Sequence, residues 1–138
     1  MTGAESRTES GALGRLGFRP GQVVIEYGYD DDVDETFREQ VEDATASPLE
    51  DEDFDGVVDA VLLWWRDGDG DLGDDLMDAI ATLEDGGFIA LLTPGTGRLD
   101  RVPAADVQDS CNAVGLTSTA AQPVGAGEWV VQRLVGRR

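Results

Sequence analysis

The stretch Val57–Trp65 reads VVDAVLLWW, and the polar, glycine-rich run RDGDGDLGDD follows it at once. Nearly every side chain of the first stretch is apolar, which is typical of a strand covered on both faces, as in a parallel sheet. Downstream, apolar residues recur with helical spacing, at Leu72, Leu76, Ala79, Ile80 and Leu83. Gly86-Gly87 is suited to end that helix. A buried strand, a loop and an amphipathic helix make up the repeating unit of a wound α/β fold.

The rest of the chain continues this alternation of strand and helix. We expect further strands at Gln22–Tyr27, Phe88–Leu92, Leu116–Ala120 and Glu128–Leu134, and further helices at Asp32–Asp43 and Pro103–Val114. The last two strands, joined by a loop at Pro123–Gly127, are expected to form an antiparallel pair that closes a mostly parallel sheet. The sequence therefore predicts an α/β fold of three layers that is Rossmann-like.

This order of elements resembles a reduced class I methyltransferase sheet, in which the last strand is inserted antiparallel. The resemblance is carried by GGFIALLTP at residues 86–94, followed by a helix and a strand pair. Compared with a full methyltransferase domain, two strand–helix units are missing between Asp43 and Val57. There, Pro48 and the run LEDEDFDG predict a connector with at most one helical turn. The resemblance implies a fold and carries no activity by itself.

The length of 138 residues suits one domain. We expect a flexible tail at residues 1–14, which are small and polar, and a single α/β domain at residues 15–138. No apolar run approaches the roughly 20 residues of a membrane span, and the N-terminus has no apolar core for a secretory signal. With Cys111 as the single cysteine and no histidine, an internal disulfide and a zinc site of the usual ligands are excluded. These features predict a cytoplasmic protein.

The acidity of the chain is concentrated in one half. The net charge is −19, and residues 26–85 contain 23 acidic residues against two arginines, Arg38 and Arg66, a net charge of −21. Such a field repels nucleic acid and anionic lipid, so we expect no direct contact with DNA, RNA or a membrane. It favours a partner protein with a basic surface, and the oligomeric state stays open.

The turn after the first predicted strand is where a fold of this type would hold a cofactor. Glycines there let the backbone approach the ligand, but in the run from Ile25 to Asp32 only Gly28 is a glycine. The acidic residue that would bind a ribose, about 20 residues further on, is expected to be missing together with its strand. We therefore expect no cofactor. If S-adenosylmethionine is bound nonetheless, Glu26, Gly28 and Tyr29 are the candidate residues.

The loop after the apolar strand contains aspartates at the spacing of an EF-hand calcium site. Asp67, Asp69 and Asp71 occupy positions 1, 3 and 5 of such a loop, and Asp78 falls at position 12. Leu72 stands where the loop needs glycine, and the preceding segment is predicted to be a strand rather than a helix. The favoured interpretation is structural, with Asp69 or Asp71 capping the next helix. Calcium is kept as the alternative.

Residues next to these two loops are the candidates for contact with a partner, namely Asp30, Asp31, Asp32, Asp34, Trp64, Trp65 and Arg66. On a strand, the two tryptophans point to opposite faces, so both are expected in the core unless one face has no helix. No catalytic residue is predicted, because the chain contains neither histidine nor lysine. Glu26 and Asp59 form the best carboxylate pair for acid–base chemistry, and Cys111 is expected to be a small buried residue.

Three strings together resemble one known family: PGQVVIEYGY at residues 20–29, the following DDDVDE, and VVDAVLLWWRDGDGDLGDDLMDA at residues 57–79. The resemblance extends from about Leu16 to Leu134 and is to an actinobacterial family of small acidic proteins that carries only a "domain of unknown function" label. It implies a methyltransferase-like α/β fold and supplies no activity, cofactor or catalytic residues.

These observations favour a non-catalytic, Rossmann-like protein that works by binding another protein through its acidic face, as a protein-binding or regulatory module. Whether the chain is an enzyme stays open. The first alternative is an S-adenosylmethionine-binding, methyltransferase-like enzyme. The second is a mimic of nucleic acid, which would present carboxylates to a DNA-binding protein in place of phosphates.

Overall fold

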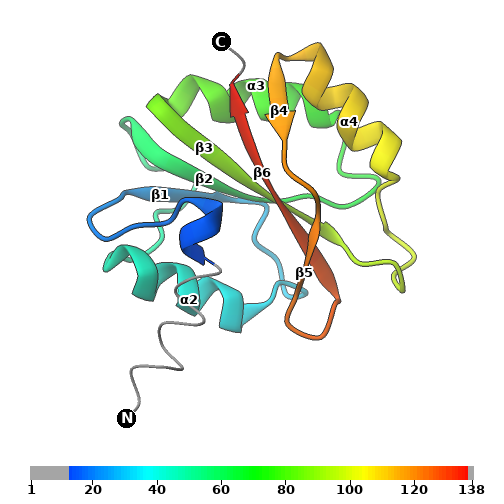
Figure 1. Ribbon diagram of the computed structural model, residues 1–138, viewed down its shortest axis with the longest axis horizontal. Coiled ribbons are helices and arrows are strands. Elements are labelled where there is room, and N and C mark those ends of the chain that lie inside the picture. The colour runs from blue at the N-terminus through cyan, green and yellow to red at the C-terminus, as the bar shows by residue number, and fades with distance from the viewer. Residues whose placement is uncertain (1–12, 137–138) are drawn as a thin grey trace.

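The apolar stretch forms β2 (Val58–Trp64), a central strand of the six-stranded sheet in the computed structural model, which describes residues 13–136. β2 lies between β1 (Val24–Tyr27) and β3 (Leu83–Pro94) and pairs with both in parallel. The sheet order is β1-β2-β3-β6-β4 (Figure 1). The predicted parallel core of three strands is confirmed.

The last strand closes the sheet in the antiparallel direction. β6 (Trp129–Gly136) lies between β3 and β4 (Leu116–Ser118) and is antiparallel to both. A further short strand, β5 (Gln122–Val124), also pairs with β6, within the segment where we had expected a loop around Pro123. The insertion of the final strand matches the expected Rossmann-like, methyltransferase-like arrangement.

Helices cover both faces of the sheet. α2 (Glu35–Thr45) lies on one face, and α3 (Leu72–Thr82) and α4 (Ala104–Ala113) lie on the other (Figure 1). α2 begins at Asp34, whose carboxylate accepts a hydrogen bond from the Phe37 amide. Three layers therefore form as predicted, with one apolar core on each side of the sheet.

Successive side chains of a strand point to opposite faces of the sheet, so they belong alternately to the two cores. Trp64 is buried on the α2 side, where its ring meets Phe37 and Trp129 edge to face. Trp65 is buried on the α3 side together with Leu72. The prediction that the two tryptophans point to opposite faces is confirmed.

Two local predictions were wrong. Gly86 and Gly87 do not end a helix, because α3 ends at Thr82 and both glycines lie within β3, at a shift in the register between β2 and β3. Leu13, assigned to the expected tail, is buried in the core next to Phe18. The remainder of that tail, residues 1–12, lies outside the described residues.

The segment between α2 and β2 replaces the two missing strand–helix units. Its one sheet contact is an isolated parallel bridge between Glu50 and Ile25, in which the Glu50 amide donates to the Val24 carbonyl and the Glu26 amide donates to the Glu50 carbonyl, both at 2.8 Å. No helix forms in this connector, for which at most one helical turn was predicted. Within residues 13–136, no helix has the length and apolar character to cross a membrane.

Candidate functional site

A cavity of about 440 Å³ opens at the carboxyl ends of β1 and β2. In open α/β sheets, ligands bind outside the carboxyl ends of the strands, so the cavity lies where a ligand of this fold would bind. We call it the carboxyl-edge cavity. Its lining consists of residues 27–30, residues 63–66, Glu52, Asp69, Asp75 and Asp78.

A second cavity, of about 560 Å³, lies at the other end of β3. It includes Gly86, Gly87 and Arg133, whose guanidinium lies 5.2 Å from the centre of the Phe88 ring. The Arg133 Nε has no hydrogen-bond partner. This cavity lies at the amino-terminal side of the parallel strands, away from the edge where ligands of this fold bind, and we treat the carboxyl-edge cavity as the candidate site.

Gly28 is held in place by the protein itself. Its φ of +81° is in the left-handed region, and a Cβ at this position would lie 2.2 Å from the Trp64 carbonyl oxygen. The Gly28 amide donates to Glu52 (3.1 Å), and its carbonyl accepts from Arg66 (2.9 Å). A glycine is therefore required here by the close approach of β1 and β2, whether or not a ligand is bound.

The other two candidate cofactor residues both contact Arg38, but only one of them lines the carboxyl-edge cavity. Tyr29 lines the cavity and is half exposed, and its hydroxyl donates to Glu35 at 2.6 Å. Glu26 does not line the cavity, because its carboxylate lies on the α2 side, where it accepts hydrogen bonds from Arg38 and from the Trp64 indole. All three bonds measure 2.7–2.8 Å, so Glu26 is a structural residue that joins β1, β2 and α2.

Glu52 is the residue of this site that sequence reasoning missed. It follows the bridge at Glu50, so it stands at the end of a one-residue remnant of a strand beside β1, 24 residues after Gly28. That is the place where a Rossmann-like fold carries the acidic residue for a ribose. The distance of 24 residues from Gly28 could have pointed to Glu52, because this fold places its acidic residue about 20 residues after the glycine loop. However, the run LEDEDFDG has no strand pattern, and we had expected the strand that carries this residue to be absent.

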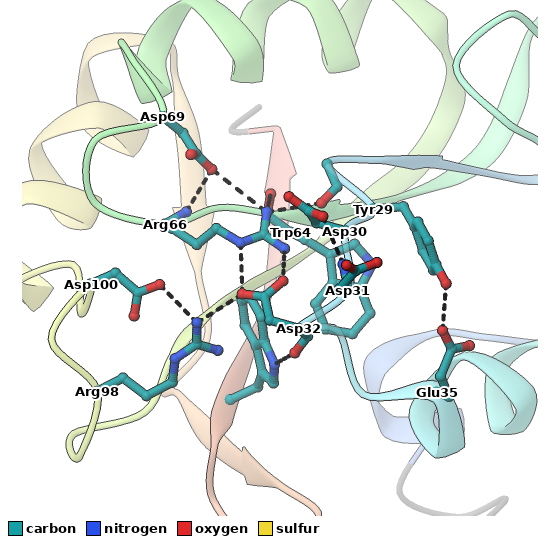
Figure 2. Close-up of polar contacts among 12 residues, drawn as sticks. Tyr29, Asp30, Asp31, Asp32, Glu35, Trp64, Arg66, Asp69, Arg98 and Asp100 are labelled. Atoms are coloured by element: carbon teal, nitrogen blue, oxygen red, sulfur yellow. Dashed lines mark hydrogen bonds and ion pairs between the residues drawn. The ribbon is translucent and has the colours of Figure 1, made fainter.

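Asp32 forms the centre of an ion-pair network at the rim of the site (Figure 2). Its carboxylate accepts from Arg66 at 2.5 and 3.0 Å and from Arg98 at 2.7 Å. Both guanidiniums lie over the Trp129 ring, and the Trp129 indole donates to the Asp32 carbonyl at 2.9 Å. The hydrogen bonds from Arg66 and Arg98 lower the pKa of Asp32 to about 2. This network fixes the loop after β1 and occupies both arginines.

Most carboxylates of the cavity have no cation beside them. Arg66 is the single basic residue of the lining, and it pairs with Asp32 and lies 3.7 Å from Asp69. Asp30, Glu52, Asp75 and Asp78 form no ion pair with any residue that the structure describes. Burial, followed by repulsion from the neighbouring carboxylates, raises the pKa of Asp75. The cavity is therefore a concentration of unbalanced negative charge.

The aspartate loop is explained by helix capping. Asp71 is the N-cap of α3, Asp74 and Asp75 lie in its first turn, and the Asp69 carboxylate accepts from the Arg66 amide. Across residues 13–136, no group of three or more acidic, cysteine or histidine side chains is placed to hold a metal ion. Asp67, Asp69, Asp71 and Asp78 thus are not brought together as an EF-hand would require.

The remaining candidates are placed as follows. Trp64 and Trp65 are 0% and 4% exposed, so neither offers an exposed anchor to a partner. Asp30, Asp31 and Asp32 are exposed, and Asp34 caps α2. Glu26 and Asp59 do not form a pair, because the Asp59 carboxylate accepts from the Val23 amide. Cys111 is buried as expected, and burial raises the pKa of its thiol.

Comparisons with known proteins agree with the fold. A family model described as "Protein of unknown function (DUF3052)" matches residues 13–138. An uncharacterised protein of Mycobacterium tuberculosis is 45% identical over 121 residues, which cover 88% of this chain and 75% of the relative. An uncharacterised protein of Mycobacterium bovis matches with the same identity and coverage.

Solved methyltransferases share the architecture. Precorrin-6y C5,15-methyltransferase from Geobacter metallireducens superposes with a TM-score of 0.60 at 11% identity, covering 95% of this chain and 87% of its own. Ribosomal protein L11 methylase from Lactobacillus delbrueckii gives 0.55 at 10% identity, covering 97% and 80%. At these identities the likeness shows a methyltransferase-like fold and carries no activity to this chain.

Proposed function

This chain belongs to the DUF3052 family of proteins of unknown function, and we propose that it is a non-catalytic, cytoplasmic binding protein. In this proposal, a partner protein with a basic surface binds to the acidic face around the carboxyl-edge cavity. The single observation that carries the proposal is the set of cavity carboxylates that no described cation balances.

The use of arginine in the acidic half supports this proposal. Residues 26–85 contain two arginines, and both form ion pairs within the protein. Arg38 pairs with Glu26 and Glu35. Arg66 pairs with Asp32 and Asp69. Most of the other carboxylates in this half therefore face solvent without a counter-charge from the chain. A basic partner would find an attractive field there, which raises the rate of association more than it raises the affinity.

The available side chains argue against catalysis. The sequence has no histidine or lysine, and its one thiol is buried. Arg66, the one cation that lines the cavity, is already bonded to Asp32 and to the Gly28 carbonyl. A reaction at this site would therefore rely on carboxylates alone, with no free cation to stabilise a developing negative charge.

Affinity capture from a mycobacterial lysate tests the proposal. The bait is the full chain at about 50 mM salt, where attraction between charges is strong. Two bait variants have the same net charge: Asp75→Asn/Asp78→Asn removes two cavity charges, and Glu84→Gln/Asp85→Asn removes two exposed charges at the opposite end of the sheet. We expect a partner that the unmodified chain and the second variant retain and the first variant loses. Recovery of no partner at low salt would contradict the proposal.

One observation favours a second candidate, the binding of S-adenosylmethionine. Gly28 and Glu52 stand where this type of fold places its ligand-contacting glycine and acidic residue, and both line the cavity. Calorimetric titration with S-adenosylhomocysteine decides between the candidates. Binding that is lost in Glu52→Gln would support the enzyme-like alternative, whereas absence of heat at millimolar ligand would leave the protein-binding function in place.

A further inference from the structure

We infer that the carboxyl-edge cavity receives a single cationic side chain, an arginine or a lysine, that anchors the partner protein. This inference rests on the proposed function, since it names the point at which the acidic face makes its most specific contact. It assigns the cavity a ligand class, an alkyl guanidinium or ammonium group carried on a flexible apolar stem.

The charge of the lining sets the sign of the ligand. Four carboxylates, Asp30, Glu52, Asp75 and Asp78, meet at one cavity. Within the described part of the chain none of them forms an ion pair, and only Asp30 lies close enough to Arg66 to raise the pKa of that guanidinium. Glu52 accepts one hydrogen bond, from the Gly28 amide, which leaves its other oxygen free to accept. A cation entering here would relieve the repulsion between these groups as well as bind to them.

The walls of the cavity set the shape of the ligand. The rings of Tyr29, which is 51% exposed, and of Tyr27, which is partly buried, supply apolar surface beside the carboxylates, and the buried Leu63 and Trp65 lie beneath them. A long side chain can bury its methylene stem on such a surface while its charged end meets the acids. The volume of about 440 Å³ is large enough to accommodate one long side chain.

The protein already uses this combination of acid and ring for its own arginines. Arg38 lies 4.6 Å from the centre of the Tyr29 ring and bonds to Glu26, and Arg66 and Arg98 lie over Trp129 while both bond to Asp32. Three arginines at the rim of the site are thus held between a carboxylate and an aromatic ring. The cavity offers acids and rings for a fourth cation, since Arg66, the one arginine that lines it, is already bonded to Asp32 and to the Gly28 carbonyl.

A metal ion fits this arrangement less well than an organic cation. No three acidic side chains among the described residues converge closely enough to ligate one ion. A side chain with several N–H donors can reach carboxylates that lie too far apart to share a metal. The spread of the acids over the loop after β1, the 50–55 segment and α3 therefore favours the organic cation.

Calorimetry with short peptides tests the inference on the full chain. The probes are N-acetyl-triarginine amide, the equivalent trilysine, and tricitrulline, which keeps the shape of arginine without its charge. At about 50 mM salt we expect the two cationic peptides to bind and tricitrulline to give no heat. In Asp75→Asn/Asp78→Asn we expect the dissociation constant for triarginine to rise about tenfold, and in Glu84→Gln/Asp85→Asn by less than about twofold.

Glu52→Gln is a second cavity variant. Because Glu52 lies outside α3, its effect on binding cannot result from a local change in that helix. We expect it to weaken triarginine binding about fivefold, with circular dichroism unchanged. Equal weakening in the cavity variants and in Glu84→Gln/Asp85→Asn would overturn the anchor and leave the acidic-face function standing. Failure of both cationic peptides to bind the unmodified chain, together with a partner captured through the cavity, would overturn the anchor alone. Failure of both the peptides and the capture would overturn both proposals.

Discussion

The backbone at Gly28 has no room for a side chain. A Cβ there would meet the Trp64 carbonyl oxygen at 2.2 Å, and the φ of +81° is strained for any other residue. We expect Gly28→Ala to lower the free energy of unfolding by about 3 kcal/mol or more. Gly21→Ala is the control, since Gly21 has a similar φ of +91° and open space around its Cβ position, and should cost about 1 kcal/mol. Equal costs in urea denaturation would show that the close contact is unimportant.

Asp32 links stability to pH. Its pKa falls from 3.8 to about 2 on folding, so the folded state binds the proton less tightly than the unfolded chain does. The stabilisation is therefore present above about pH 4 and is lost as the pH falls toward 2. Because the side chain is 34% exposed, we expect Asp32→Asn to cost only about 1–2 kcal/mol at pH 7.

Urea melts of both proteins between pH 2 and pH 7 measure this effect. The difference between the unmodified chain and Asp32→Asn should shrink as the pH approaches 2. Asp31→Asn is the matched control, because Asp31 is exposed and pairs with none of the described arginines. A constant difference across the pH range would show that the ion pairs of Asp32 do not stabilise the fold.

The join between β1, β2 and α2 depends on one buried carboxylate. Glu26 is 6% exposed and accepts three hydrogen bonds, two from Arg38 and one from Trp64. Its replacement by glutamine leaves the Arg38 guanidinium half-buried without its main counter-charge, and we expect a loss of about 2–4 kcal/mol. Glu35→Gln removes an ion pair from the same arginine at a 54% exposed position, where solvent screens the charge, and should cost much less. Thermal unfolding of the two variants should therefore separate widely.

The elements themselves show what a sequence can and cannot reveal. Strands β2 and β3 and helices α2 and α3 were predictable because each carries an apolar pattern of one period, and α4 was predictable because Pro103 and Gly115 mark its two ends. Gly86-Gly87 misled the prediction, since a glycine pair serves equally at the end of a helix and at an irregular position in a strand. β5 and the bridge at Glu50 were not visible, because three residues or one residue give no pattern and depend on the neighbouring strand for their hydrogen bonds.

The site was predictable only where position along the chain fixes position in space. The predicted parallel order of β1 and β2 is enough to bring the loops after them to one edge, because parallel strands have their carboxyl ends on the same side. Glu52 could not be assigned to that edge without the bridge that places it there. The pairing of Asp32 with Arg98, which is 66 residues away, also had no local signal, because β6 and the loop after β3 must be placed first.

Across the whole molecule, repulsion between acidic groups should make stability depend on salt. With 29 acidic and ten basic residues, the six described ion pairs are outweighed by unpaired carboxylates, and the half-buried pairs are screened less than the exposed charges. Raising the ionic strength from about 10 mM to about 150 mM shortens the screening length from about 30 Å to about 8 Å. We expect the protein to gain about 1 kcal/mol, or about 3–5 °C in Tm.

Divalent cations extend this test to the aspartate loop. If the carboxylates of residues 67–78 act as caps and as part of a diffuse field, calcium and magnesium at equal concentration should raise the Tm equally, because screening depends on charge and not on the identity of the ion. Calcium in a dedicated site would add its own binding energy to the folded state, about 2.7 kcal/mol at a hundredfold excess over its dissociation constant. A calcium-specific rise that Asp67→Asn abolishes would therefore establish a site that the arrangement of Asp71 as a helix cap argues against. A fall in Tm with added sodium chloride would instead show that the ion pairs, and not the repulsion, dominate the electrostatics of this fold.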